Sequence, residues 1–177
     1  MEALIPLPES DALAGRAREG DRAALDALVL QFYRPVLAFV RRMVLHRDDA
    51  QDITQDVFAR VVRGIREYRA GTRFSTWLFR IAINRVIDLS RKPRVRPPPP
   101  APPPCDDPLT GRESVERFFD AVADLPESLK VPLLLAYQQN LPHSEIGEIL
   151  EISANAVKLR IHEAVRRLRL ALREERS

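Results

Sequence analysis

A run of prolines near the middle of the 177-residue chain limits its architecture more than any other feature. The run lies in RKPRVRPPPPAPPPCDDP, from Arg91 to Pro108. Each proline ring removes an amide donor and clashes with the preceding turn, so a helix cannot continue through this stretch. Apolar residues on both sides of it recur at helical spacing. The sequence therefore predicts two small helical domains joined by a stiff, proline-rich linker.

The composition favours an all-α globular protein. Hydrophobic residues make up 45% of the chain, which argues against wholesale disorder. The aromatic residues sit within helical patterns rather than alternating strands. The single cysteine, Cys105, excludes an internal disulfide framework and leaves redox sensing and an inert thiol open as its role. Since no signal-peptide start and no apolar run of ~20 residues occurs, we expect a cytoplasmic protein without membrane insertion.

Changes in composition and pattern divide the chain into four segments. These are a lead-in at 1–19, a four-helix domain at 20–92, the linker at 93–113 and a second helical domain at 114–177. Within the last segment, two short helices at about 142–150 and 153–173 follow each other closely. This is the sequence outline of a helix-turn-helix.

Capping residues and prolines predict where individual helices begin. Asp21 is a suitable N-cap for the first helix of the four-helix domain, and Pro35 suits the first turn of the second. Ser75 is the expected cap of the fourth helix. Ser144 and Ser153 are the expected caps of the two helix-turn-helix helices.

Motifs for catalysis are missing from the sequence. The three histidines, His46, His143 and His162, have no second ligand at metal spacing. There is no glycine-rich phosphate loop and no G-x-S-x-G elbow. We therefore expect no enzyme activity, no cofactor and no metal site.

The last predicted helix carries a basic face. Its apolar stripe leaves five candidate DNA contacts on the remaining surface: Asn155, Lys158, Arg160, His162 and Arg166. Such a helix can lie in a major groove, with its N-terminal side chains at base edges and its later arginines at phosphates. A solvated basic helix without a DNA partner is the alternative.

A second candidate nucleic-acid surface lies in the first domain. Arg80 and Asn84 are one helical turn apart, and both residue types suit base edges or phosphates. The preceding loop mixes cations with rings, a combination suited to single-stranded nucleic acid, in Tyr68, Arg69, Arg73 and Phe74. Trp77 and Phe79, by contrast, are expected in the core.

The third predicted helix has an acidic face, formed by Asp49, Asp52, Gln55 and Asp56. This face would repel DNA. It is either a plain solvated helix face or a docking surface for a basic protein partner.

Three stretches together resemble bacterial sigma factors of the extracytoplasmic-function (ECF) group. They are DAQDITQDVFARV, RFSTWLFRIAINRVIDLSRK and LPHSEIGEILEISANAVKLRIHEAVRRLR. The resemblance covers roughly 20–91, the family's region two, and 115–172, its region four. It implies a dissociable subunit that directs core RNA polymerase to particular promoters and makes or breaks no bond itself.

The resemblance also implies a role for each surface. The acidic face would dock on the clamp helices of the polymerase's largest subunit. Arg80 and Asn84 fall at positions that contact the minus-ten promoter element, and the loop from Tyr68 to Phe74 falls where a flipped base is captured. Lys158, Arg160 and His162 fall at contact positions for the minus-thirty-five element. Because members of this group are commonly held inactive by an anti-sigma factor, such a partner is expected too.

The helix-turn-helix departs from the family pattern. Asn155-Ala156 replaces a common Gly-Thr pair, Leu159 a common serine and Glu163 a frequent arginine, while Glu151 takes a turn position that is often glycine. These changes remove hydroxyl and cationic donors, so the base preference at the minus-thirty-five element stays open.

Two other functions fit part of the sequence. A helix-turn-helix transcriptional regulator explains the second domain but not the acidic helix beside a basic one. An all-helical adaptor, or an anti-sigma-like protein, would use the basic faces to bind a protein. Binding to core polymerase discriminates among the three.

Overall fold

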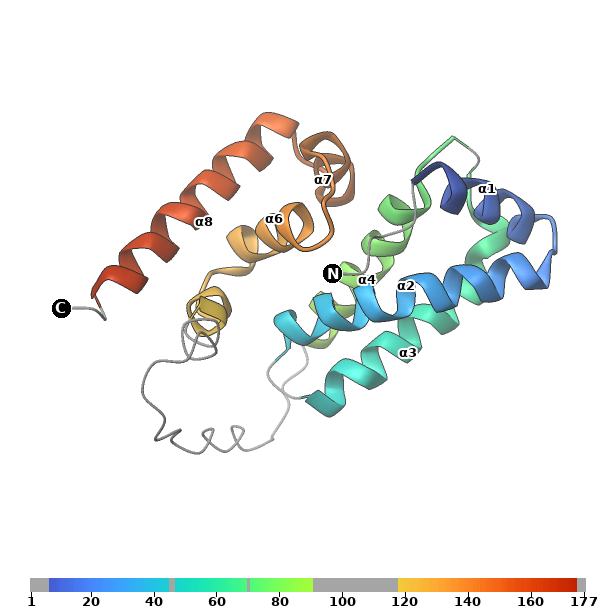
Figure 1. The fold of residues 1–177 in the computed structure, drawn as a ribbon, viewed down its shortest axis with the longest axis horizontal. Helices are drawn as coiled ribbons and strands as arrows, with labels where there is room; N and C mark the ends of the chain where they lie inside the picture. Colours follow the sequence, from blue (N-terminus) through green and yellow to red (C-terminus); the bar gives the residue numbers. More distant parts are fainter. Residues whose placement is uncertain (1–6, 45–46, 70, 91–117, 175–177) are drawn as a thin grey trace. The chain divides into compact units, whose positions relative to one another are not determined.

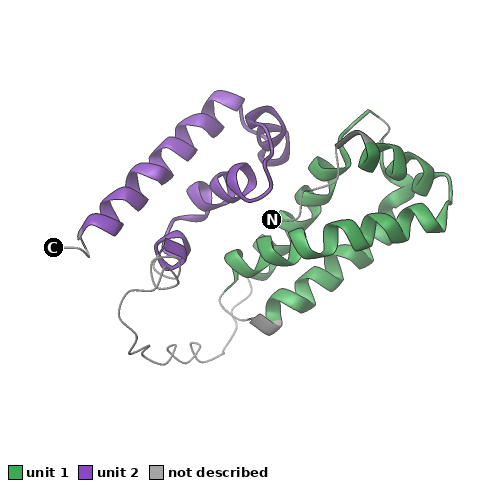
Figure 2. Ribbon diagram, in the orientation of Figure 1, with its two compact units in different colours: residues 1–95 green, residues 96–177 purple. Residues whose placement is uncertain are grey.

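The computed structural model describes residues 7–44, 47–69, 71–90 and 118–174, and all regular secondary structure in these ranges is helical. The chain divides into two compact units, unit 1 (residues 1–95) and unit 2 (residues 96–177), shown in Figure 2. The prediction of an all-α protein with two small helical domains is thereby confirmed. The linker expected at 93–113, with Cys105, lies outside the described residues.

Unit 1 is built around one long helix, α2 (Arg22–Met43). It packs against α1 (Leu7–Arg18), α3 (Arg47–Gly64) and α4 (Phe74–Ser90), as Figure 1 shows. A short 3-10 turn, η1 (Ile65–Glu67), follows α3. Two edge-to-face ring pairs join α2 to α4, with centroids 5.2 Å apart for Phe32 and Phe74 and 5.5 Å apart for Phe39 and Phe79. These rings form the centre of the core.

Pro35 does not begin a helix, which corrects the prediction of two helices in this region. It lies inside α2, where a proline costs ~3 kcal/mol or more. Phe32, Val36 and Phe39 on either side are at most 1% exposed, and burial of each stabilises the continuous helix by about 1.5–3 kcal/mol. The free energy gained by burying these three side chains therefore exceeds the cost of a proline inside the helix. Among the described residues, α2 alone is long and apolar enough to cross a membrane, a property that its core face explains.

The segment expected as a lead-in contains α1, which packs into the core of unit 1. Ala14 and Ala17 of α1 are 0% and 3% exposed. Asp21 caps α2 as predicted, because the Ala24 amide donates to its Oδ1 at 3.0 Å. Arg16 of α1 donates to the other oxygen of the same carboxylate at 2.6 Å. The cap of α2 is thus also bonded to the end of α1.

Unit 2 consists of α6 (Glu127–Tyr137), α7 (His143–Leu150) and α8 (Ala154–Glu174), preceded by a helical segment at 118–123. Both α6 and α7 pack against α8, around a core that includes Leu135, Ile146, Val157 and Ala164. The pair α7–α8 is the predicted helix-turn-helix.

The turn between α7 and α8 depends on two unusual backbone positions. Glu151 ends α7 in the left-handed conformation, with φ 56° and ψ 41°. The Ile152 amide then donates to the Gly147 carbonyl at 3.0 Å. A Cβ at residue 147 would lie 2.6 Å from the Ile152 carbonyl oxygen, so the turn needs glycine there.

The two serines expected as caps behave differently. Ser153 caps α8 as predicted, since its Oγ accepts a bond from the Ala156 amide at 3.1 Å. Ser144 does not cap α7, because the helix begins at His143 with Pro142 at the N-cap and no side-chain bond there. The Pro142 carbonyl accepts the first helical bond, from the Ile146 amide at 3.1 Å, so Ser144 lies inside the first turn.

Candidate functional site

The acidic face of α3 presents its four residues unequally. Asp52 and Gln55 are exposed, Asp49 is 8% exposed and Asp56 is half-buried. Since an ionic contact with a partner needs an accessible carboxylate, Asp52 is the acidic group on this face that α3 offers directly.

Asp56 is engaged within unit 1. Its carboxylate forms an ion pair with Arg85 of α4, and the Nε of Arg60 lies 3.8 Å from it. The side chains of Asp56 and Arg85 are 31% and 22% exposed. This pair joins α3 to α4 and therefore connects the acidic face to the helix that carries the candidate nucleic-acid contacts.

The solvent side of α4 carries a polar stripe. Arg73, Arg80 and Asn84 are exposed and spaced by seven and four residues, which brings them to one side of the helix. Trp77 lies on the same side and is half-buried, whereas the sequence predicted it in the core. Phe79 is 1% exposed, as predicted. The indole is therefore an additional ring beside the cations, which its i+4 spacing from Arg73 could have indicated.

The rings of Tyr68 and Phe74 belong to the core, which corrects the expectation that they are open to a base. They are 3% and 0% exposed, and their centroids lie 6.0 Å apart. The Tyr68 hydroxyl donates to the Thr72 carbonyl. Burial, together with the negative charge of Asp11, raises the pKa of Tyr68 to about 12. Tyr68 thus shapes the loop from inside, in the neutral form.

The loop between η1 and α4 presents two cations on its surface, Arg69 and Arg73. Its turn is closed by Thr72, whose Oγ1 and amide donate to the Arg69 carbonyl at 2.6 and 3.2 Å. Ser75, the expected cap of α4, lies inside the helix instead. The Phe74 amide donates to Oδ1 of Asp11 at 2.7 Å, so a residue of α1 takes the capping role.

α8 gathers most of its predicted contacts on one face. At ~100° per residue, these positions fall within about 80° of one another, and all four side chains are exposed: Asn155, Lys158, His162 and Arg166. Leu159, 63% exposed, shares this face. The side chains directed inward are Val157, Ile161, Ala164 and Leu168.

Arg160 does not share that face. It is half-buried and lies about 160° around the helix from His162, at the flank of the buried stripe. The sequence placed Arg160 with the others on the face left by the apolar stripe, and the helical period separates it from them.

Glu163 is occupied within α8. It accepts bonds from Arg166 and from Arg167, each at 2.8 Å. These two bonds, from Arg166 first and then Arg167, lower the pKa of Glu163 to about 2. The carboxylate therefore neutralises part of the basic face.

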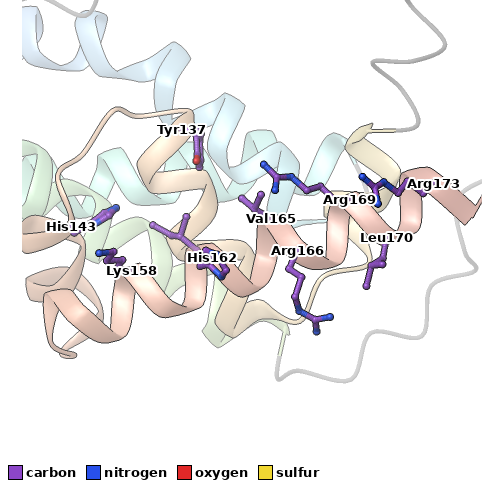
Figure 3. A pocket seen from close by; sticks show the side chains of 10 residues that line it. Tyr137, His143, Lys158, His162, Val165, Arg166, Arg169, Leu170 and Arg173 are labelled. Carbon is purple, nitrogen blue, oxygen red and sulfur yellow. The ribbon is translucent and has the colours of Figure 1, made fainter.

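A groove of about 520 Å³ runs along α8 in unit 2 (Figure 3). Ile161 and Val165 supply its apolar part, and Tyr137 of α6 and His143 of α7 border it. Its cationic lining comes from α8, namely Lys158, Arg166, Arg169 and Arg173, with His162 beside them. Arg173 was not among the contacts predicted from the sequence, although it continues the same helical spacing. Among the described residues, no cluster of three or more His, Cys, Asp or Glu side chains could hold a metal.

Two family models match the chain, Sigma-70 region 2 over residues 28–96 and Sigma-70, region 4 over residues 116–168. The ECF RNA polymerase sigma factor SigW of Bacillus subtilis is 30% identical, over 90% of this chain and 94% of its own. The RNA polymerase sigma factor CarQ of Myxococcus xanthus is 31% identical, over 90% of this chain and 95% of its own.

Solved structures share the fold. CnrH, in complex with the cytosolic domain of CnrY, matches with a TM-score of 0.76 at 23% identity, over 94% of this chain and 98% of its own. The sigma factor RpoE of Bartonella quintana, in complex with the anti-sigma factor NepR, matches with a TM-score of 0.70 at 18% identity. The match covers 84% of this chain and 96% of RpoE.

Proposed function

Since the chain belongs to the ECF sigma factors, which direct promoter-specific initiation by RNA polymerase, we propose that its two units bind different parts of the initiation complex. Unit 1 docks on core polymerase and recognises and opens the minus-ten element. Unit 2 reads the minus-thirty-five element. One observation carries the proposal: unit 1 bears an exposed carboxylate on α3, Asp52, and exposed cations on α4 and directly before it, Arg80 and Arg73. A protein that binds a basic protein surface and nucleic acid at once needs both charges.

The docking surface is the acidic face of α3, which fits the clamp helices of the polymerase's largest subunit. Asp52 and Gln55 make the direct contacts, because they are exposed. Asp49 and Asp56 lie beside them, buried and half-buried, and contribute negative potential more than contact area.

The minus-ten surface combines the loop after η1 with the stripe on α4. Arg69 and Arg73 hold the phosphates of the separated strand, and Arg80 and Asn84 reach bases or phosphates beside them. Tyr68 and Phe74 act indirectly, because their rings are buried and set the shape of the loop.

The minus-thirty-five surface is the face of α8 that begins at its N-terminus. Asn155, Lys158 and His162 are nearest the bases, and Arg166 follows one turn later at the backbone. Arg160 belongs to the proposed set because it falls at a contact position of the family's recognition helix, although it lies off the face of the other residues.

Three further properties complete the proposal. The protein makes or breaks no covalent bond itself, and it acts in the cytoplasm, where polymerase and promoters meet. An anti-sigma factor binds it, as the anti-sigma factor NepR binds the RpoE whose fold it shares.

Reconstitution with core polymerase tests the function directly. We expect promoter-specific run-off transcripts with the wild type and weaker core binding for Asp52→Arg, which reverses an exposed charge. Asp56→Arg should weaken core binding as well, but it also breaks the pair with Arg85, so Asp52→Arg is the cleaner variant. Tight binding to promoter duplex without polymerase would favour a helix-turn-helix regulator, and absence of both activities would favour an adaptor.

A second experiment separates opening from docking. Asn84→Ala should lower the permanganate reactivity of promoter thymines near the minus-ten element while core affinity stays the same. Reactivity equal to that of the wild type would remove Asn84 from the opening surface.

A further inference from the structure

The side chain of the N-cap residue of α4 cannot cap the helix. Arg73 stands at the N-cap, because its carbonyl accepts the first helical bond, from the Trp77 amide at 3.2 Å. A guanidinium has donors and no acceptor, so the Arg73 side chain cannot bond the unpaired amides of the first turn. Ser75 is 3% exposed and its hydroxyl has no hydrogen-bond partner among the described residues. Neither Arg73 nor Ser75 therefore supplies an acceptor for the amide at the start of the helix.

Asp11 of α1 supplies this acceptor. The Phe74 amide donates to its Oδ1 at 2.7 Å, across 63 residues of sequence. A carboxylate at this place is also favoured by the positive end of the helix dipole. Packing fixes its position, because α1 contacts α2, η1 and α4, and the neighbouring Ser10 and Ala14 are 1% and 0% exposed. Asp11 is therefore held at the start of α4 by α1 as a whole.

The bond lies where the cationic loop enters α4. Phe74 is fully buried, and the residue before it is the exposed Arg73. At the other end of the loop, the Tyr68 hydroxyl bonds the Thr72 carbonyl. Loss of the Asp11 acceptor would leave a part-buried amide unpaired and let the first turn of α4 fray. Arg73 would then lose its fixed position relative to Arg80 and Asn84.

We propose that Asp11 is a positioning residue for promoter opening, and that α1 thereby takes part in that step. α1 lies before residues 28–96, the part of the chain that matches the region 2 model. Asp11 acts through the Phe74 amide and needs no contact with nucleic acid. The proposal rests on the proposed function, because it takes the loop from Arg69 to Arg73 and the stripe on α4 as the surface that binds the minus-ten strand.

The test compares two substitutions in polymerase holoenzyme. Asp11→Ala removes the acceptor, whereas Asp11→Asn keeps an oxygen at the same position. For Asp11→Ala we expect affinity for a single-stranded minus-ten oligonucleotide to fall about fivefold, the size of a lost N-cap. Affinity for core polymerase and for minus-thirty-five duplex should not change. Asp11→Asn should stay within about twofold of wild type, as should the matched control Glu9→Ala, an exposed acidic residue of the same helix.

Hydrogen exchange in the free chain gives a readout that does not depend on polymerase. The Phe74 amide should exchange faster in Asp11→Ala and remain protected in Asp11→Asn and Glu9→Ala. Unchanged oligonucleotide binding by Asp11→Ala overturns the proposal, and so does a parallel loss of core binding, which would mean general unfolding of unit 1. If wild-type holoenzyme fails to bind the oligonucleotide, the proposed function itself fails, and the positioning role of Asp11 fails with it.

Discussion

The two helices proposed to meet promoter DNA begin in different ways. α8 is capped by Ser153, the residue directly before it, whereas α4 is capped by Asp11 from another helix. The start of α8 is therefore set by local sequence and by the turn from α7. The acceptor at the start of α4 reaches its place only when α1 has packed. The proposed duplex-reading surface of unit 2 thus rests on local structure, and the proposed strand-binding surface of unit 1 on tertiary structure.

Gly147→Ala should give the largest effect and confine it to unit 2. The added Cβ would lie 2.6 Å from the Ile152 carbonyl oxygen, and a forced shift of this kind costs about 1–3 kcal/mol. Calorimetry should show a lower melting temperature for unit 2 and no change for unit 1. Gly15→Ala is the matched control, since nothing lies within 4 Å of its Cβ. It should stabilise α1 by about 0.5–1 kcal/mol. Equal destabilisation of both units would contradict the local character of the α7–α8 turn.

Ser153→Ala should lower the free energy of unfolding of unit 2 by about 1 kcal/mol, because the Ala156 amide loses its acceptor. Denaturant titration measures this value. Ser144→Ala, within the first turn of α7 and without a capping bond, should change stability by much less. If Ser153→Ala and Ser144→Ala lower the free energy of unfolding by the same amount, Ser153 is not the cap that starts α8.

These caps show what the sequence can and cannot reveal. Ser153 was predictable because a cap and its amide lie three residues apart. Asp11 was not, because its partner is 63 residues away and only packing brings them together. The prediction of a helix start at Pro35 was wrong for a related reason. The side chains of α2 around Pro35 are buried by other helices, and this burial keeps the helix continuous. The fold class, by contrast, follows from helical spacing alone.

The residues of the candidate site also divide into those that helical spacing predicts and those whose position depends on tertiary packing. Arg80, Asn84 and the face of α8 follow from helical spacing and are exposed. Tyr68 and Phe74 were assigned to the surface by residue type, and three-dimensional packing buries them. The helical period alone already separates Arg160 from the face that the other predicted contacts of α8 share.

The exposed faces of α4 and α8 also differ, because the face of α8 carries an exposed aliphatic residue. Leu159 is 63% exposed among the cations of α8. In a major groove such a side chain suits the methyl group of thymine. Replacing the facing thymine by uracil should weaken duplex binding about fourfold, from ~0.8 kcal/mol for one buried carbon. Leu159→Ser should bind both duplexes equally. A wild type insensitive to uracil at every minus-thirty-five position would exclude this contact.

Glu151→Gly should stabilise unit 2 by about 0.5–1 kcal/mol. The left-handed conformation costs a non-glycine residue ~1–2 kcal/mol, and the greater freedom of glycine in the unfolded chain offsets part of the gain. The midpoint of urea unfolding should rise for unit 2 only. Glu151→Ala, which keeps the strain, should not raise the midpoint.

Glu163→Gln should have the smallest effect, visible in acid. The pKa of Glu163 is lowered from 4.5 to about 2, so its contribution is complete above pH 4.5 and is lost as the pH falls through about 2. Between these values, the stability of unit 2 should fall more in wild type than in Glu163→Gln. The difference should shrink in 1 M salt, since the pairs are exposed. Parallel pH curves at low salt would contradict the assignment.

The ion pair between Asp56 and Arg85 would couple the two binding surfaces proposed for unit 1. Any polymerase cation that takes the Asp56 carboxylate competes with Arg85, and so frees a positive charge on α4 next to Asn84. Linkage makes the effect reciprocal: a phosphate that draws Arg85 away changes the affinity of Asp56 for polymerase by the same factor. Under the proposed function, polymerase and promoter DNA would each change the affinity of unit 1 for the other through this one carboxylate.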